Sequence, residues 1–173
     1  MPADISLMLY KAYIIPHLEY CGPLLLGINK TLNKKLESAN HIALNVLLNF
    51  GNSLDYDSIL SAVNMQSPKH RRYNQSLVLP FKCLKGNGPD YISDLFKPRI
   101  LRYNLRDSDH NLTQPSYNNR YYHNSFSYKA SHLWNQLSSY IKRSTELSEY
   151  RKHLRSFNLI ILRASCKCNF CIS

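Results

Sequence analysis

The sequence contains no long apolar run. Its longest candidates, Ala12 to Pro16 and Leu24 to Leu26, are a handful of residues each, whereas a membrane-spanning helix needs about 20 apolar residues. The amino end, Met1 to Ser6, also lacks the basic and apolar regions of a secretory signal. We therefore expect no membrane contact, an intracellular location in the nucleus or cytoplasm, and cysteines that are thiols or metal ligands.

Catalytic motifs are absent as well. There is no Walker loop, no G-x-S-x-G elbow, no H-E-x-x-H and no pair of adjacent aspartates to hold two divalent metal ions. Asp107 and Asp109 form a D-x-D pair, but His110 follows them and arginines surround them, which favours a solvated loop. We assign no catalytic residue and expect the isolated chain to be inactive as an enzyme.

Acidic residues become scarce after residue 66. Residues 1–66 contain four Lys or Arg and five Asp or Glu, whereas residues 67–173 contain 18 and six. A neutral apolar first third followed by a basic remainder indicates a chain that packs at one end and contacts polyanions at the other. The alternative is a solvated basic surface without a partner.

Apolar spacing predicts a mainly α-helical fold: a helical bundle, then a basic irregular segment and two further helices. A first helix, with Tyr10 and Ile14 in its seam, is expected to kink or stop at Pro16. The longest helix is expected to end at Gly51. Its seam contains Leu32, Leu36, Ala39, Ala43, Val46 and Phe50.

Serines mark the predicted starts of the later helices. Ser53, Ser67 and Ser144 are candidate N-caps, and the spacing over residues 125–137 predicts a further helix with Trp134 as a core anchor. The helix after Ser67 has an apolar stripe of Tyr73, Leu77, Phe81 and Leu84 that Pro80 interrupts, the last helix buries Tyr150 and Leu154, and Cys21 and Cys83 are predicted small core residues. The predicted regions are a helical region (1–66), a basic and a short helix (67–96), an Arg/Tyr/Asn-rich loop (97–124), C-terminal helices (125–165) and a Cys-rich tail (166–173).

Basic residues in two places are candidates for contact with nucleic acid. The cations that follow Ser67 oppose the dipole of the helix they begin, which suggests that a partner supplies negative charge. Residues 97–124 interleave arginine with tyrosine, a pairing that holds nucleic acid through phosphate and base. That segment fits an irregular loop packed over the core by its tyrosines equally well, and it could contain a small hairpin. Together with the flank of the last helix, where Arg155 also lies, the candidates are Lys69, Arg71, Arg72, Arg99, Arg102, Arg106, Arg120, Lys129, Arg151 and Lys152.

One metal-like pattern, Cys166-x-Cys168-x-x-Cys171, lies in the tail. A structural zinc site needs four ligands, so one is missing from this pattern. His153, another chain or a downstream continuation could supply the fourth ligand, and a metal-dependent dimer is one consequence. A tail of reduced thiols that binds no Zn²⁺ is the alternative interpretation.

Six ordered segments resemble one known family. Residues 10–21 (YKAYIIPHLEYC) are similar to the helix after the polymerase palm in reverse transcriptases of jockey-like LINE (non-LTR) retrotransposons, and residues 32–47 match the long helix that follows it. Residues 81–96 (FKCLKGNGPDYISDLF) resemble the family's F-K-x-L-x-G-x-x-P-x-Y-x-x-D-L-F. The other segments are residues 103–108 with Asn111 and Leu112, residues 125–128, and Ala130 with residues 133–137 (LWNQL).

The resemblance implies the thumb and post-thumb part of an RNA-directed DNA polymerase. The palm aspartates that hold Mg²⁺ in the parent enzyme are not in this sequence, so no catalytic residue and no Mg²⁺ site carries over. The implied partner is RNA or an RNA–DNA duplex, gripped through its backbone by the basic residues named above. A helical remnant that no longer binds, or a protein-interaction module, is the alternative function, and the oligomeric state is left open.

Overall fold

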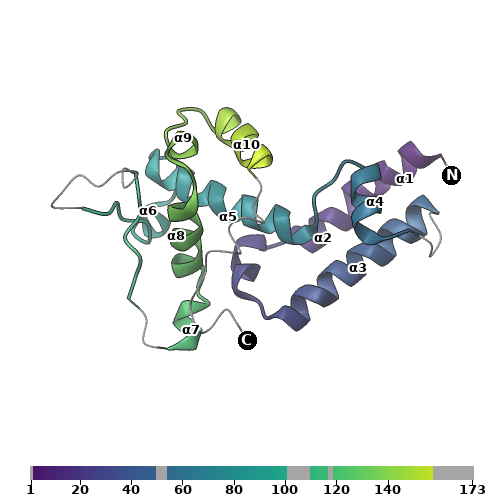
Figure 1. Cartoon of the computed structure of the whole chain (residues 1–173), viewed down its shortest axis with the longest axis horizontal. Coiled ribbons are helices and arrows are strands. Elements are labelled where there is room, and N and C mark those ends of the chain that lie inside the picture. Colours follow the sequence, from purple (N-terminus) through teal and green to yellow (C-terminus); the bar gives the residue numbers. More distant parts are fainter. Residues whose placement is uncertain (1, 50–53, 101–109, 117–118, 158–173) are drawn as a thin grey trace. The chain divides into compact units, whose positions relative to one another are not determined.

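Helices make up most of the regular structure in the computed structural model, which describes residues 2–49, 54–100, 110–116 and 119–157 (Figure 1). The prediction of a mainly α fold is confirmed. The chain divides into two units, Met1–Tyr73 and Asn74–Ser173, and the division falls inside one helix, whereas the predicted change of character after residue 66 falls just before it.

The first unit begins with a helical stretch that continues through Pro16. A π-helical turn precedes the proline, and in it the Ile15 N–H donates to the Tyr10 carbonyl, five residues earlier. Because proline has no N–H and its ring crowds the preceding turn, a wider turn lets the chain stay helical where the sequence predicts a kink or stop. The elements are α1 (Ala3–Leu9), the π turn (Tyr10–Ile14), α2 (Ile15–Glu19), a 3-10 helix (Gly22–Gly27), α3 (Lys30–Leu48), α4 (Tyr56–Ala62) and the start of α5 (Pro68–Leu84).

Helix α3 packs against α1 and the π turn, but its buried face differs from the predicted seam. Leu44 and the polar Asn40 are fully buried, whereas Val46 is 74% exposed and Leu32 is 49% exposed. Asn40 can lie in the core because its amide has hydrogen-bond partners there, so the seam is rotated relative to the apolar spacing. The core of this unit is Tyr10, Leu44, Ile59 and Leu60.

The ends of the helices correct several predictions. Asn49, in the left-handed conformation at φ 52°, ends α3, and both Gly51 and the predicted cap Ser53 lie outside the described residues. Asp55 occupies the N-cap of α4. Cys21 is exposed and left-handed, so it is not the core residue predicted, whereas Cys83 is buried as expected.

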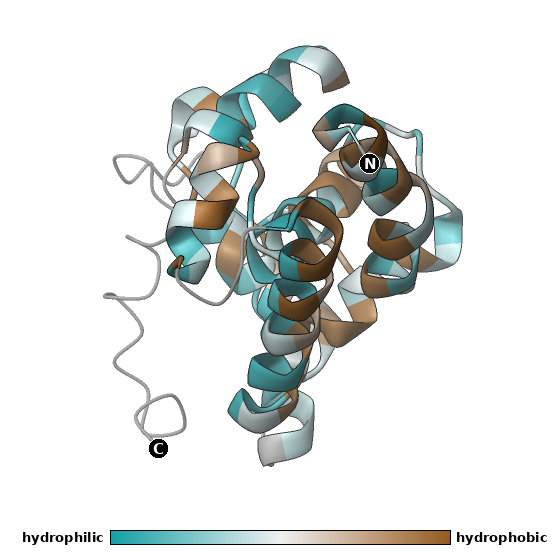
Figure 2. Cartoon of the chain, turned by 90° about the vertical axis from the view of Figure 1, so that its right-hand side faces the viewer, coloured by the Kyte–Doolittle hydropathy of each residue, from teal (hydrophilic) through white to brown (hydrophobic). Residues whose placement is uncertain are grey.

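The second unit is organised around aromatic side chains. Phe81 stacks on Tyr150 with ring centroids 4.2 Å apart, and Trp134 lies 6.1 Å from Tyr150, which confirms Trp134 as a core anchor. Hydrophobic and hydrophilic residues alternate along the helices of the chain (Figure 2). The elements are the rest of α5, α6 (Asp90–Ser93), α7 (Arg120–His123), α8 (Phe126–Gln136), α9 (Ser139–Lys142) and α10 (Leu147–Ser156).

Helix α5 runs through Pro80 without a break. Leu77, Pro80 and Phe81 are all buried. Burial of a Leu or Phe side chain contributes about 1.5–3 kcal/mol, which is comparable with the cost of about 3 kcal/mol for an internal proline. The prediction that Pro80 interrupts this helix is therefore wrong, because packing on both sides of the proline offsets its cost.

Between α6 and α7, within the predicted loop over residues 97–124, the chain forms a short antiparallel pairing. Pro98 bridges Leu112, the Arg99 N–H donates to the Asn111 carbonyl at 2.8 Å, and the Thr113 N–H donates to the Lys97 carbonyl at 2.8 Å. Helix α7 follows at Arg120. The described parts of this segment are therefore partly ordered into a bridge and a helix.

Candidate nucleic-acid interface

Two arginines at the start of α5 are bound within the first unit. Ser67 caps the helix as predicted, with the His70 N–H 3.4 Å from its Oγ. The Lys69 backbone N–H donates to Glu37 at 3.1 Å, and Arg71 forms an ion pair with Glu19 and donates to the Gln66 carbonyl at 2.6 Å. For Arg71, the negative charge that the sequence suggests a partner supplies is therefore provided by Glu19 of the same unit.

Two predicted contacts to nucleic acid therefore have structural roles instead. Arg72 is 3% exposed and donates to the side chain of Asn33, and burial lowers its pKa from the ordinary value. Arg71 is held by Glu19 and is half-buried. A buried or internally paired guanidinium is not presented to a phosphate, so we remove Arg71 and Arg72 from the interface, and Lys69, half-buried, stays a weaker candidate.

A largely buried row of hydrogen-bonded polar groups runs through the first unit. The Tyr10 hydroxyl donates to Asn40 Oδ1, the Asn40 amide donates to the Tyr56 hydroxyl at 2.7 Å, and Tyr56 donates to Glu37 at 2.8 Å. Burial raises the pKa of Tyr10, and burial with the Glu37 hydrogen bond raises the pKa of Tyr56 further. Both phenols therefore stay protonated donors at neutral pH.

Exposed basic residues gather on α10 in the second unit. Arg151, Lys152 and Arg155 are exposed, while Tyr150 and Leu154 on the opposite side are fully buried, as the sequence predicts. Arg151 and Arg155 lie one helical turn apart and so share a face. The first turn begins after Glu146 rather than at the predicted cap Ser144.

A hydroxyl–imidazole–hydroxyl row ties α9 to α10. His153 Nδ1 is 3.2 Å from Ser144 Oγ, and His153 Nε2 is 2.9 Å from the hydroxyl of Tyr140, whose ring is otherwise exposed. Both ring nitrogens of His153 are therefore engaged within the chain. A role for His153 as the fourth zinc ligand would require both contacts to be rearranged or one to be lost.

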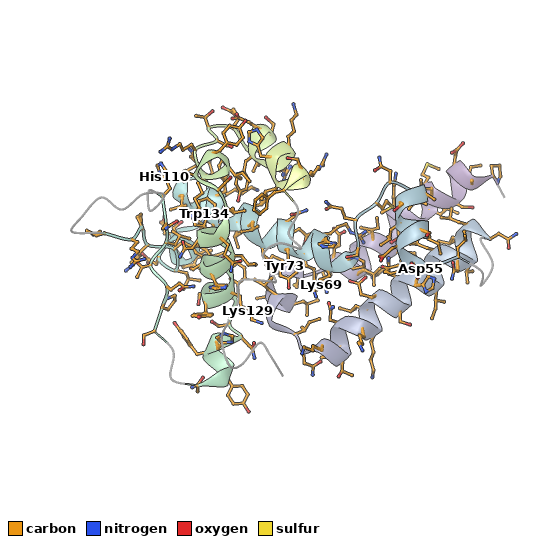
Figure 3. All side chains as sticks on the ribbon, in the orientation of Figure 1. Asp55, Lys69, Tyr73, His110, Lys129 and Trp134 are labelled. Carbon is orange, nitrogen blue, oxygen red and sulfur yellow. The ribbon has the colours of Figure 1, made fainter. Side chains whose placement is uncertain are left out.

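The other candidates are divided between described and undescribed parts of the chain. Arg99 is exposed on the bridged segment, and Lys129 is half-buried on α8, toward the opposite end from Trp134 (Figure 3). Arg120 begins α7, but its side chain is outside the description. Arg102, Arg106, Cys166, Cys168 and Cys171 lie outside the described residues, and among the residues that are described no cluster of metal-ligating side chains occurs.

Lys129 influences two histidines beside it. Burial first, and then the charge of Lys129, lowers the pKa of His123. Burial, His123 and Lys129 likewise lower the pKa of His132, which has Gln114 Nε2 and Gln136 Nε2 2.8 and 2.9 Å from its ring nitrogens. Both imidazoles are therefore neutral at neutral pH and add no charge to the interface.

The structure adds members that the sequence does not single out. Lys85, Lys97 and Arg143 are exposed in the second unit. Exposed tyrosines accompany them at Tyr91, Tyr121 and Tyr140. Helix ends could have pointed to two of them. Lys85 directly follows α5 and Arg143 directly follows α9, positions where a cation complements the helix dipole.

Comparison of the chain with models of protein families, with curated proteins and with solved structures gives no match. Within the described parts of the chain, every helix is too short or too polar to cross a lipid bilayer.

Proposed function

We propose that this chain is the thumb and post-thumb part of an RNA-directed DNA polymerase of the non-LTR retrotransposon type, and that its second unit contacts the sugar-phosphate backbone of RNA or an RNA–DNA duplex. The observation that carries the proposal is the exposed cationic face of α10, formed by Arg151, Lys152 and Arg155. Cations that neutralise phosphates release counterions, which is the main source of backbone affinity.

Other exposed groups of the second unit support the same role. Arg99 and Lys97 are exposed on the bridged segment, and the exposed tyrosines offer rings on which bases can stack. Phosphate contacts of this kind position a protein on nucleic acid without reading its sequence. The part proposed here is therefore a grip on the duplex, and the nucleotide-adding chemistry belongs to palm aspartates that this sequence does not contain.

Fluorescence anisotropy of a labelled RNA–DNA primer–template across salt concentrations tests the proposal. Each phosphate neutralised on a duplex steepens the log–log slope by about 0.9. The triple variant Arg151→Gln, Lys152→Gln, Arg155→Gln is expected to reduce the slope by about 2–3 if each cation meets one phosphate.

A matched control comes from the first unit. Lys30→Gln, Lys34→Gln, Lys35→Gln removes three exposed cations of α3 and is expected to leave the slope nearly unchanged. If both triple variants reduced the slope equally, the binding would be nonspecific attraction to a basic chain. If the chain did not bind at low salt, the proposal would be wrong.

A specific observation favours the protein-interaction alternative for the first unit alone. Ile42 and Val46 are 60% and 74% exposed on α3, one helical turn apart. Exposed apolar side chains at this spacing are typical of a helix that contacts another protein. Negligible salt dependence of RNA binding would shift the proposed function toward this alternative.

A further inference from the structure

The second unit contains a pocket of about 320 Å³ between the end of α5, the bridged segment, α8 and α9. Its size falls within the range of small-molecule sites. Among the described residues that line it, three are cationic and none is acidic: Lys85, Lys142 and Arg143. Phe81, Trp134, Pro98, Leu84 and Leu112 give it an apolar wall.

Hydrogen bonds fix one side of this pocket. The Trp134 indole N–H donates to the His110 carbonyl at 2.8 Å, and the two residues lie side by side in Figure 3. The Asn135 amide binds both backbone groups of Leu112, accepting from its N–H at 2.7 Å and donating to its carbonyl at 2.9 Å. The arm of the bridge that contains Leu112 is therefore held on α8 by these hydrogen bonds.

A buried lysine contributes charge to the same side. Lys142 is 5% exposed, and its Nζ donates to Asn111 Oδ1 at 2.7 Å and to the Asn135 carbonyl at 3.2 Å. A buried ammonium is costly unless its hydrogen bonds are satisfied. Lys142 therefore adds a positive charge beside the pocket, and these two acceptors are neutral oxygens.

The other two cations that line the pocket are exposed. Lys85 and Arg143 are exposed, and the Lys85 Nζ lies 5.8 Å from the centre of the Phe81 ring. An apolar wall beside exposed cations suits a ligand that combines an aromatic ring with a negative group. A phosphorylated nucleoside has this chemistry: its base packs on apolar and aromatic side chains, and its phosphate accepts hydrogen bonds from lysine and arginine.

We propose that this pocket binds one nucleoside monophosphate, with the phosphate at Lys85 and Arg143 and the base against the Phe81 side of the pocket. The same chemistry is offered by a free nucleotide and by the 5′-phosphorylated end of a strand. None of Arg151, Lys152 and Arg155 lines the pocket. The nucleotide site and the proposed backbone contact can therefore be tested independently of each other.

Trp134 is the only tryptophan of the chain, so its fluorescence reports on this pocket. We expect AMP to change the emission in a saturable way, and adenosine or inorganic phosphate to bind at least about tenfold more weakly, because each lacks half of the ligand. Equilibrium dialysis with labelled AMP checks the affinity without relying on fluorescence. No saturable binding up to millimolar AMP, or equal affinity for adenosine, would overturn the proposal.

Variants and oligonucleotides complete the test. Lys85→Gln and Arg143→Gln are expected to weaken AMP binding about tenfold each, with an unchanged circular dichroism spectrum, whereas Lys34→Gln on α3 leaves it unchanged. If Lys34→Gln weakens binding as much as the pocket variants, the pocket is not the site. A 5′-phosphorylated oligonucleotide that competes with AMP, while its 5′-hydroxyl counterpart does not, assigns the site to strand ends, and AMP binding without such competition assigns it to free nucleotides.

Discussion

The two units use their cations in different ways. Residues 1–73 contain seven Lys or Arg and five Asp or Glu, whereas residues 74–173 contain 15 and six. In the first unit Arg71 and Arg72 are turned inward, to Glu19 and Asn33. In the second unit Arg151 and Lys152 are exposed. Adjacent basic residues can therefore be structural or surface-exposed, and the acceptors available within the fold decide which.

The cores differ as well. The first unit buries a row of polar groups through Asn40, whereas the second stacks aromatic rings around Tyr150. A core held by hydrogen bonds depends on every partner being present, because an unsatisfied buried group costs about 1–3 kcal/mol. A core of stacked rings depends mainly on volume and area. Substitutions in the two cores should separate these contributions.

The largest effect is expected from Tyr150→Ala in the second unit. Tyr150 is fully buried, stacks on Phe81 and donates to the Leu77 carbonyl at 3.1 Å. Removal of such a ring costs about 3–5 kcal/mol of unfolding free energy. Urea denaturation followed by Trp134 fluorescence measures it, because that residue reports on the second unit.

Tyr150→Phe is the matched control, because it keeps the ring and removes only the hydroxyl. We expect a cost of about 1 kcal/mol from the lost hydrogen bond. Equal costs for Tyr150→Phe and Tyr150→Ala would show that the hydrogen bond, and not the stacked ring, stabilises this core, and would remove the contrast between the units.

In the first unit, Asn40→Ala is expected to cost about 2–3 kcal/mol, because both the Tyr10 and the Tyr56 hydroxyls lose a partner. The loss should appear in the denaturation followed by circular dichroism more than in the Trp134 transition, since these contacts lie in the first unit. Asn45→Ala on the same helix, where the side chain lies 3.1 Å from the half-buried His41, is expected to cost under about 1 kcal/mol. If Asn45→Ala were as costly as Asn40→Ala, the buried row would have no special weight.

Apolar spacing predicts the elements of this chain better than their buried faces. The helix with Tyr150 and Leu154 in its seam, and the core position of Trp134, follow from the spacing and are confirmed. The buried face of α3 does not follow from the spacing, because the polar Asn40 is buried there with hydrogen-bond partners. Hydropathy contains no information on which polar residues will find partners across the core.

The prolines and the cations after Ser67 also show what the sequence pattern cannot predict. Pro16 and Pro80 lie within continuous helical stretches because packing and a π turn compensate for the missing N–H. The cations after Ser67 form a conspicuous cluster in the sequence, yet the acceptors of Arg71 and Arg72 are far away in the chain. Only tertiary structure shows that these cations are bound internally, and the pocket beside Trp134 depends on the same kind of long-range contact.

A smaller effect is expected from Gly88→Ala. A Cβ at Gly88 would lie 2.6 Å from Cys83 Sγ and 3.0 Å from Cys83 Cα, so the turn after α5 has to shift. We expect a cost of about 1–2 kcal/mol, measured by the Trp134 transition. The double variant Gly88→Ala, Cys83→Ala removes the closer of the two contacts. It should therefore cost less than the sum of the costs of the two single variants. Simple additivity would contradict the close approach.

The most gradual effect expected is that of pH on the stability of the second unit. Burial and Lys129 lower the pKa of His123 and His132 below the ordinary value of 6.5 in the second unit. Between the folded and unfolded pKa values the unfolded chain binds more protons, so stability is full above about pH 6.5 and falls as the pH decreases, by up to about 1.4 kcal/mol per pH unit for each imidazole. Urea denaturation at pH 7.5, 6.5 and 5.5, followed by Trp134 fluorescence, should show this decline. His123→Gln, which cannot be protonated there, is expected to flatten it, and Lys129→Gln to flatten it less, because the charge of Lys129 is a smaller cause than burial. An unchanged slope in His123→Gln would show that the buried imidazole is not what makes the second unit sensitive to acid.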